Sequence, residues 1–172
     1  TCLDMVGDIN ITSMYGETPL FVAVDREQES IVSMLVERGA EVNNANKDGI
    51  TPLINAVLSG NLNIVDTLLK AGADIDVRDS NGGTLLHRVS GAGKDNNVFK
   101  SNEVSIESGP DFSGVLRLLI SSGVSLLTSD NEGNTALHVA VLSGFVNGVK
   151  ILVEAGTPVD AKNSYGRTPL ME

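Results

Sequence analysis

The sequence is poor in cysteine, in aromatic residues and in positive charge. Its one cysteine, Cys2, excludes an internal disulfide bond, and this fits a reducing compartment, so we expect an intracellular, cytoplasmic location. Tryptophan is absent and aromatic residues make up 3% of the chain, whereas apolar residues make up 41%. The core must therefore consist of many small aliphatic contacts, which favours packed short helices over a barrel with one large centre.

Lysine and arginine number 12 against 22 aspartates and glutamates, which gives a net charge of −10. An acidic surface repels phosphate backbones and anionic lipid headgroups, so neither nucleic acid nor a membrane is expected as a partner. No apolar run approaches the roughly 18 residues that a membrane span needs. The acidity suits a partner with a basic segment, or it serves only to keep the protein in solution.

What the sequence does contain is glycine at regular intervals. Gly16, Gly49 and Gly82 are evenly spaced along the chain. The interval from Gly82 to Gly133 is longer by an insertion of 18, and Gly166 then follows at the original interval. A second series keeps the same spacing: Gly39, Gly72, Gly123 and Gly156. Two glycine series that share one period, of about 33 residues, and one interruption predict an array of structural repeats.

Each repeat carries the signals of two short helices. A threonine two residues after the first glycine can accept a hydrogen bond from the first helical turn, and proline often follows at the first helical position. These threonines are Thr18, Thr51, Thr84, Thr135 and Thr168. Apolar first helices are predicted over 20–24, 53–58, 85–89 and 137–142, each followed by a second helix with apolar residues at helical spacing. Helices this short are unstable alone in water, so stacking must stabilise them.

These phrases resemble the ankyrin repeat. Residues 18–23 read Thr-Pro-Leu-Phe-Val-Ala, residues 51–56 read Thr-Pro-Leu-Ile-Asn-Ala, and residues 135–140 read Thr-Ala-Leu-His-Val-Ala. Residues 39–43 and 72–76 add the phrases Gly-Ala-Glu-Val-Asn and Gly-Ala-Asp-Ile-Asp. The resemblance implies an all-α repeat solenoid, in which paired antiparallel helices are joined by β-hairpin-like loops.

We expect a single ankyrin-repeat domain over residues 1–172. It divides into the tail of a preceding repeat (1–12), repeats at 13–45, 46–78, 79–129 and 130–162, and the start of a truncated repeat at 163–172. Neither end resembles a polar capping repeat, so we expect a segment of a longer array.

The third repeat is the least regular. Gly91 and Gly93 weaken the end of its first helix, and a polar insertion near 93–110 separates its two helices. The insertion is interpreted either as a tolerated surface loop or as a contact arm around 98–99 or 104–106.

The sequence offers little that points to catalysis. The run 90–94, Ser-Gly-Ala-Gly-Lys, lacks the upstream glycine and the following Ser or Thr of a phosphate-binding loop. His87 and His138 fall in the histidine slot of the repeat, and we expect them to bond nearby backbone and steady the loop between repeats. No histidine or cysteine pair has the spacing of a metal site or of a nucleophile and base. We therefore expect no enzyme activity, no cofactor and no metal.

The resemblance implies partner binding at the hairpin tips and on the concave face of the first helices. The candidate positions are Met14, Tyr15, Glu17, Asp25, Arg26, Lys47, Asp48, Ile50, Leu58, Asn131, Glu132, Leu142 and Tyr165. The same alignment adds Ser80, Asn81, Asn134, Ser164 and Arg167 at the tips. The apolar members are expected to be exposed, as in a contact patch, and Asp25, Asp48 and Glu132 are expected to form an acidic rim for a basic partner.

Asn43 occupies a slot that is hydroxylated in some ankyrin proteins, or its side chain serves only in turn hydrogen bonding. The leading hypothesis for function is a non-catalytic protein–protein interaction module. The alternative is an intramolecular regulatory or spacer segment of a larger enzyme, channel or scaffold protein.

Overall fold

The computed structural model describes residues 8–93 and 110–172. The chain divides into two compact units, Thr1–Asp74 and Ile75–Glu172. Unit 1 contains α1 (Pro19–Asp25), α2 (Glu29–Glu37), α3 (Pro52–Ser59) and α4 (Leu62–Lys70). Unit 2 contains α5 (Leu85–Ala92), α6 (Phe112–Ser121), α7 (Ala136–Ser143), α8 (Val146–Glu154) and a short 3₁₀ helix, η1 (Pro169–Met171).

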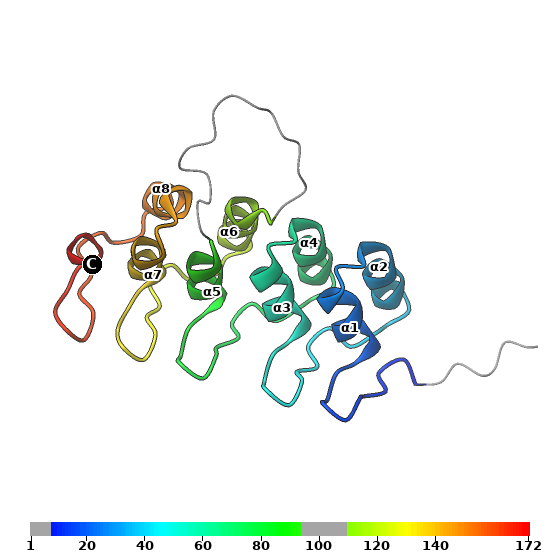
Figure 1. Cartoon of the computed structure of the whole chain (residues 1–172). Coiled ribbons are helices and arrows are strands. Elements are labelled where there is room, and N and C mark those ends of the chain that lie inside the picture. The colour runs from blue at the N-terminus through cyan, green and yellow to red at the C-terminus, as the bar shows by residue number, and fades with distance from the viewer. Residues whose placement is uncertain (1–7, 94–109) are drawn as a thin grey trace, which may run out of the picture. The chain divides into compact units, whose positions relative to one another are not determined.

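Within each unit the helices form two layers, and the hairpins extend from the layer of first helices (Figure 1). In unit 1, α1 packs against α2 and α3, and α4 packs against α2 and α3. In unit 2, α5 packs against α6 and α7, and α8 packs against α6 and α7. In the described part of the chain the backbone pairing outside the helices includes one isolated bridge, between Ser129 and Thr135, and no named strand. The predicted all-α fold of paired helices is confirmed.

The first helices begin where the threonines predict. The Oγ1 atoms of Thr18 and Thr51 accept hydrogen bonds from Phe21 N and Ile54 N, at 3.1 and 3.3 Å. Because the first helical residue of α1 and of α3 is a proline, one of the unbonded amides at each helix start is absent. At the other end of α3 and α7, Gly60 (φ 69°) and Gly144 (φ 72°) close the helix in the left-handed conformation, as predicted.

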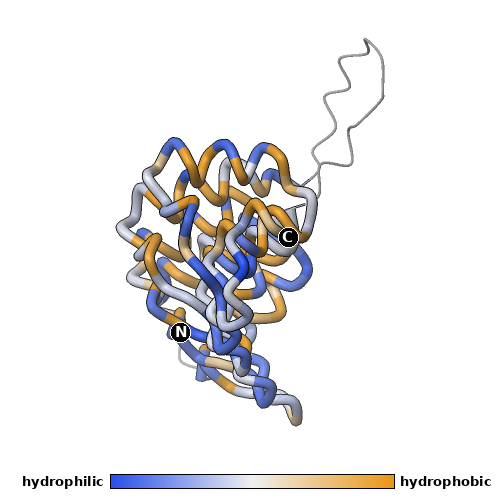
Figure 2. Tube along the Cα trace, turned by 90° about the vertical axis from the view of Figure 1, so that its left-hand side faces the viewer, coloured by the Kyte–Doolittle hydropathy of each residue, from blue (hydrophilic) through white to orange (hydrophobic). Residues whose placement is uncertain are grey.

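The core of each unit lies between its helices and consists of aliphatic side chains. The leucines of the Thr-x-Leu phrases that begin α1, α3, α5 and α7 are buried, with exposed fractions between 0 and 2%: Leu20, Leu53, Leu86 and Leu137. Leu170, in the last such phrase, is 88% exposed. Ala23 and Ala56 are also buried, and their small side chains allow neighbouring helices to approach closely. Along the helical turns in Figure 2 apolar and polar residues alternate, whereas the hairpin loops are mainly hydrophilic.

The irregular third repeat differs from its prediction in one respect. The sequence predicts its first helix over 85–89, whereas the helix runs through Gly91 to Ala92 and ends at the C-cap Gly93. The Phe145 ring, which is 2% exposed, fills the space beside Gly93. A Cβ atom on Gly93 would lie 2.6 Å from Phe145 Cε1, so glycine is required there. The insertion does separate α5 from α6, and the predicted contact arm at 98–99 or 104–106 lies outside the described residues.

Candidate partner-binding surface

Each hairpin tip is closed by a side chain that sequence reasoning missed. The first residue of every tip is Ser, Asn or Asp, and its side-chain oxygen accepts from the amides two and four residues later. Asn46 Oδ1, for example, accepts from Asp48 N at 3.0 Å and from Ile50 N at 2.9 Å. The five residues are Ser13, Asn46, Asp79, Asp130 and Asn163. This capping folds the tip back on itself and leaves the next two side chains projecting outward.

Neighbouring tips are joined by single backbone hydrogen bonds. In unit 1, Lys47 N donates to Tyr15 O at 3.0 Å. In unit 2, Ser164 N donates to Glu132 O at 2.8 Å, and Asn131 N donates to Asn81 O at 2.9 Å. The close approach needs glycine at the tip, because a Cβ on Gly133 would lie 2.8 Å from Ser164 N. The tips are therefore tied to one another as well as closed internally.

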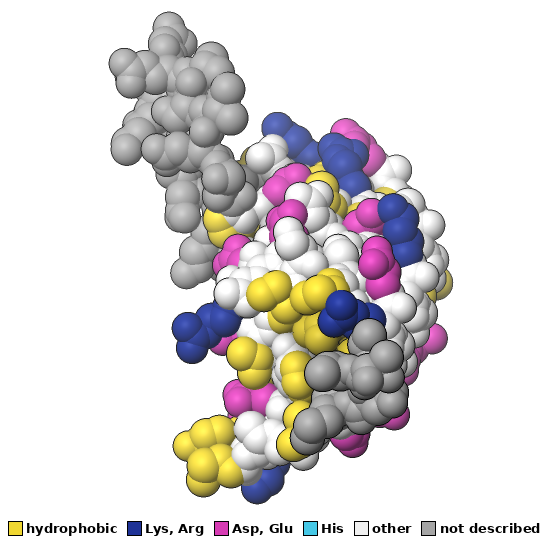
Figure 3. Space-filling view, turned by 90° about the vertical axis from the view of Figure 1, so that its right-hand side faces the viewer, with side chains coloured by type: hydrophobic (Ala, Val, Ile, Leu, Met, Phe, Trp, Pro, Cys, Tyr) yellow, Lys and Arg dark blue, Asp and Glu magenta, His cyan; other side chains and the backbone are white. Residues whose placement is uncertain are grey.

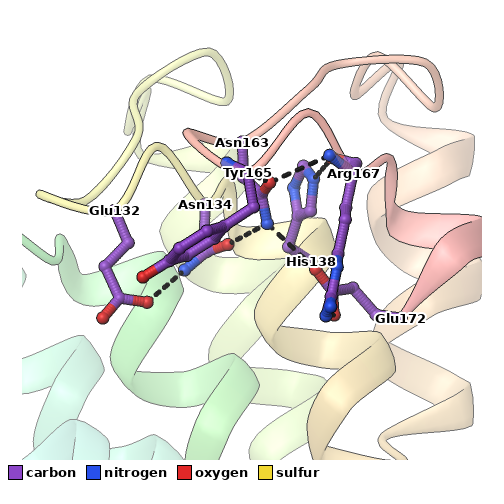
Figure 4. A network of polar contacts seen from close by, with 7 residues as sticks. All are labelled: Glu132, Asn134, His138, Asn163, Tyr165, Arg167 and Glu172. Atoms are coloured by element: carbon purple, nitrogen blue, oxygen red, sulfur yellow. Dashed lines mark hydrogen bonds and ion pairs between the residues drawn. The ribbon is translucent and has the colours of Figure 1, made fainter.

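The two histidines connect a helix start to the next hairpin, as the sequence predicts. His138 Nδ1 accepts from Thr135 N at 3.1 Å, and His138 Nε2 lies 3.0 Å from Arg167 O (Figure 4). An amide only donates and a carbonyl only accepts, so this arrangement suits the tautomer in which Nδ1 accepts and Nε2 donates. His87 makes the same pair of bonds, to Thr84 N at 3.1 Å and to Asn134 O at 2.9 Å. Each histidine thus caps its helix and fixes the hairpin of the following repeat.

Amide side chains extend this network at the last two hairpins of unit 2. Asn163 Nδ2 donates to Asn134 Oδ1 at 3.0 Å and to Glu172 Oε1 at 2.9 Å (Figure 4). Asn134 Nδ2 in turn donates to Asp130 Oδ2 at 3.2 Å. Asn134 is 7% exposed, so the expectation that it is a variable surface position is wrong: it is buried because its amide connects two hairpins.

The projecting apolar residues differ in exposure. Met14 and Tyr15 are 75% and 61% exposed at the first tip of unit 1, and Leu58 on α3 is 36% exposed. In unit 2, Tyr165 at the last tip is 70% exposed and Leu142 on α7 is 58% exposed. Four of these five therefore present most of their apolar area to solvent.

Ile50 does not behave as the sequence suggests. It is half-buried, and its amide and carbonyl are both bonded to Asn46 within the tip. The expectation that Ile50 adds a fully exposed apolar side chain to the contact patch is thus wrong, and on these grounds its place in the candidate set is the weakest.

The polar candidates also divide between the units. In unit 1, Glu17 is half-buried and bonded by Ser13 Oγ at 3.1 Å, whereas Asp25, Arg26, Lys47 and Asp48 are exposed. In unit 2, Asn131 and Glu132 are exposed at one tip, and Asn131 Nδ2 donates to Ser80 O at 3.4 Å. The structure therefore places nine of the candidate binding positions in unit 1 and four in unit 2.

Charge is distributed unequally between the units. Residues 8–74 carry ten acidic and four basic side chains, whereas the described part of 75–172 carries eight acidic and six basic ones. Asp25 is near Arg26, at 3.7 Å, but both side chains are more than half exposed, so this pair contributes little to stability. The acidic excess is therefore concentrated in unit 1.

Asn43 lies in the loop after α2 and uses both ends of its amide. Its Oδ1 accepts from Asp74 N at 2.9 Å, and its Nδ2 donates to Gly72 O at 3.4 Å. These bonds fasten one interrepeat loop to the next, and so they differ from the bonding within a turn that the sequence suggests for this slot. Its hydroxylation stays a prediction.

Two further observations bear on chemistry. Among the helices of residues 8–93 and 110–172, none has the length and apolar character to cross a membrane. In the same described ranges, no group of three His, Cys, Asp or Glu side chains is placed to hold a metal ion.

Paired helices, a constant repeat period and capped hairpins define a protein of the helical-repeat class. The family model for ankyrin repeats (3 copies) matches residues 3–79 and 105–172, and the chain belongs to the ankyrin-repeat family. Ankyrin repeats are in general protein-interaction modules without catalytic activity.

Similar stretches occur in much longer proteins. The chain is 43% identical over 58 residues to a transient receptor potential cation channel subfamily A member 1 homolog of Caenorhabditis elegans, which covers 33% of this chain and 5% of that protein. It is also 43% identical over 58 residues to a putative glutaminase 2 of Caenorhabditis elegans, and this match covers 33% of this chain and 10% of the relative. It is 47% identical over 55 residues to the palmitoyltransferase ZDHHC17 of Danio rerio, covering 31% and 9%. The matched stretches therefore span about a tenth or less of these relatives.

Proposed function

We propose that this chain binds a partner protein through its hairpin tips and the exposed faces of its first helices. The observation that supports this most strongly is the first tip of unit 1, where Met14 and Tyr15 are exposed on a closed hairpin. A hairpin backbone that is already closed before binding loses less entropy on association, and tyrosine is frequent at the centres of protein interfaces.

The partner that suits unit 1 carries a basic segment. The ten acidic side chains of residues 8–74 outnumber the basic ones by six, and Asp25 and Asp48 are exposed near the tip and first-helix candidates. Such a field accelerates the approach of a Lys- or Arg-rich peptide and weakens as salt is added. The single cysteine supports an intracellular location, where a reduced thiol persists.

The test compares three variants as bait in a pull-down from extract, followed by mass spectrometry. The first combines Met14→Ser with Tyr15→Ser, the second combines Leu142→Ser with Tyr165→Ser, and the matched control changes the exposed Met34 and Val146 of the second helices to serine. All six side chains are at least 40% exposed, so each variant is expected to fold.

A partner captured by the wild type and the control, but lost by the first variant, supports binding at the unit 1 tip. Its affinity, measured with purified components, is expected to fall as ionic strength rises. A partner retained by both tip variants contradicts the proposed surface.

A second candidate function is regulation within a longer polypeptide. The similarity to a channel, a glutaminase and a palmitoyltransferase, each matched over 5 to 10% of its length, favours this alternative. It predicts that Met14→Ser with Tyr15→Ser changes the activity of another domain of the same polypeptide, while no separate protein is captured. If neither a captured protein nor any such activity responds, the segment acts as a spacer.

A further inference from the structure

One hairpin tip of unit 2 contains a chemically reactive pair of residues. The hydrophobic side chains gathered on the α1–α2 side of unit 1 (Figure 3) suit the stacking that ankyrin repeats share, so they indicate no separate activity. The tip of residues 79–83, here called the α5 tip because it precedes α5, is different (Figure 1). In it Asn81 is followed directly by Gly82. Asparagine is among the labile residues of proteins, and a glycine after it makes it more so.

An Asn–Gly pair can rearrange without an enzyme. The glycine nitrogen, once it has lost its proton, attacks Cγ of the asparagine side chain, and the side-chain nitrogen leaves as ammonia, which closes a five-membered imide. Water then opens the imide at either carbonyl, so the product is aspartate or isoaspartate, and the net reaction consumes one water and releases one ammonia. Glycine favours the attack because it has no side chain and its backbone turns freely. The sequence has two such pairs, Asn81–Gly82 and Asn147–Gly148.

The pair in the α5 tip is free to react. Asn81 is exposed, and among the described residues its side-chain amide has no hydrogen-bond partner. Its Cγ can therefore turn toward the next backbone nitrogen. Gly82 N donates to Asp79 O at 2.9 Å, and this bond must open before the attack. One hydrogen bond at an exposed turn slows the reaction by about twofold to tenfold.

The other pair is held by packing. Asn147 and Gly148 lie in the first turn of α8, and Gly148 is buried against the Phe145 ring, which is 2% exposed. The Gly148 amide cannot turn toward Asn147 Cγ unless this ring is displaced and the start of α8 unfolds. Such an opening is much rarer than the opening of an exposed turn. The same dipeptide is thus protected in one place and exposed in the other.

The α5 tip also stabilises the reactive form of the Gly82 amide. The oxygen of the same peptide group, Asn81 O, accepts from Asn131 N of the next hairpin at 2.9 Å. Loss of the amide proton places negative charge on this oxygen, because the peptide group is conjugated. A donor that already points at the oxygen lowers the free energy of the charged form.

Positive charge offsets the one carboxylate in the α5 tip. Asp79 Oδ1 accepts from Asn81 N at 2.7 Å, and its negative charge alone would oppose loss of a nearby proton. Arg88 Nε, however, lies 2.7 Å from Asp79 Oδ2, and Arg78 Nη1 donates to Gly82 O at 3.1 Å. Two guanidinium groups therefore contact a tip that carries one carboxylate, and this favours an anionic Gly82 amide.

We propose that Asn81 is a site of spontaneous deamidation, and that its conversion to isoaspartate releases the bond between the α5 tip and the next hairpin. In isoaspartate the backbone runs through the former side-chain carbon, so the tip gains one methylene. The carbonyl that accepted from Asn131 N becomes a carboxylate that the backbone no longer positions. The modification alters an exposed tip that belongs to the candidate binding surface, and this last consequence alone rests on the proposed function.

The experiment follows positions 81 and 147 in one sample, so that Asn147 is the matched control. The purified chain is incubated at mildly alkaline pH, folded or in urea, and its peptides are separated by liquid chromatography and mass spectrometry into asparagine, aspartate and isoaspartate forms. In the folded chain Asn81 is expected to convert at least about tenfold faster than Asn147, whereas in urea the two rates are expected to agree within about threefold.

A second measurement tests the effect on the hairpins. Hydrogen exchange at the Asn131 amide is expected to be about twofold to tenfold faster in the isoaspartate fraction than in the unmodified protein. Asn81→Asp adds the charge without the methylene, so it is expected to keep the slow exchange.

Equal rates at 81 and 147 in the folded chain overturn the proposal, and so does an Asn81 that converts only in urea. Unchanged exchange at the Asn131 amide in the isoaspartate fraction overturns the release of the hairpin. None of these measurements involves a partner, so they stand whether or not the tip variants lose one.

Discussion

Replacing Gly148 by alanine is expected to destabilise the protein, although alanine is the better helix former. Gly148 lies inside α8 with no positive φ. By helix propensity alone, alanine at this position would therefore raise the free energy of unfolding by about 1 kcal/mol. A Cβ at this position, however, would lie 2.8 Å from Phe145 Cγ and closer still to the ring edge. Phe145 is 2% exposed and fixed between Gly148 and Gly93, so the ring has no free space to enter.

Overpacking of a filled core costs about 1–3 kcal/mol. Subtracting the helix gain leaves an expected net loss of about 1 kcal/mol for Gly148→Ala. When Phe145 is first changed to alanine, which itself costs about 3–5 kcal/mol, the obstacle is gone. Gly148→Ala is then expected to raise stability by about 1 kcal/mol. The sign of the effect therefore depends on the ring.

The assay is equilibrium urea unfolding followed by far-ultraviolet circular dichroism, on the wild type, both single variants and the double variant. A Phe145→Leu background, which keeps more apolar volume, is expected to show the same change toward stabilisation. The reasoning is refuted if Gly148→Ala has the same sign in all backgrounds, because the ring would then not be what excludes a side chain at 148.

Three other predictions concern the hairpins and the interrepeat loops. His138→Ala removes a helix cap and a bond to Arg167 O, so unfolding free energy is expected to fall by about 1–2 kcal/mol in urea titrations, whereas an unchanged midpoint contradicts the capping role. Gly133→Ala is expected to destabilise the protein more than Gly144→Ala. Both glycines have positive φ, where a side chain costs about 1–2 kcal/mol, but only Gly133 contacts a neighbouring hairpin. Equal shifts in the thermal midpoint would contradict this. Asn43→Ala is expected to lower the free energy of unfolding by about 1 kcal/mol and to speed hydrogen exchange at the Asp74 amide. Unchanged exchange there would show that the side chain does not fasten the loop. One added oxygen on Asn43 in mass spectra of the native protein would confirm its hydroxylation.

Local signals made most of the fold predictable. The threonine caps at Thr18 and Thr51 depend only on residues within one helical turn, so the sequence contains everything that specifies them. The bonds of His87 and His138 were predictable because the repeat register places a hairpin beside each ring.

The tip caps carried a usable signal that was missed. A Ser, Asn or Asp stands three residues before every tip glycine, from Ser13 to Asn163, and such residues favour turn bonding. Alignment of the tips on their glycines would have found it.

Other features depend on contacts that no local pattern shows. The Phe145 ring and Gly93 are far apart in sequence and belong to successive repeats, so the requirement for glycine at 93 was not predictable from the residues of α5. The burial of Asn134 likewise follows from its bond to Asn163 in the next hairpin. Which exposed residues bind a partner is a further question, since exposure is a property of one chain and binding is a property of two.

The closed hairpins separate the residues that hold the structure from those that a partner would meet. Tip capping uses the first residue, the glycine and backbone atoms, while the second and third side chains of the first and last tips take no part in it. Mutations at positions such as 14 and 15, or 164 and 165, can therefore accumulate with little penalty to folding. A lineage carrying this segment can exchange one binding specificity for another through a few such changes, and a laboratory library restricted to the same pairs of positions should yield mostly folded members.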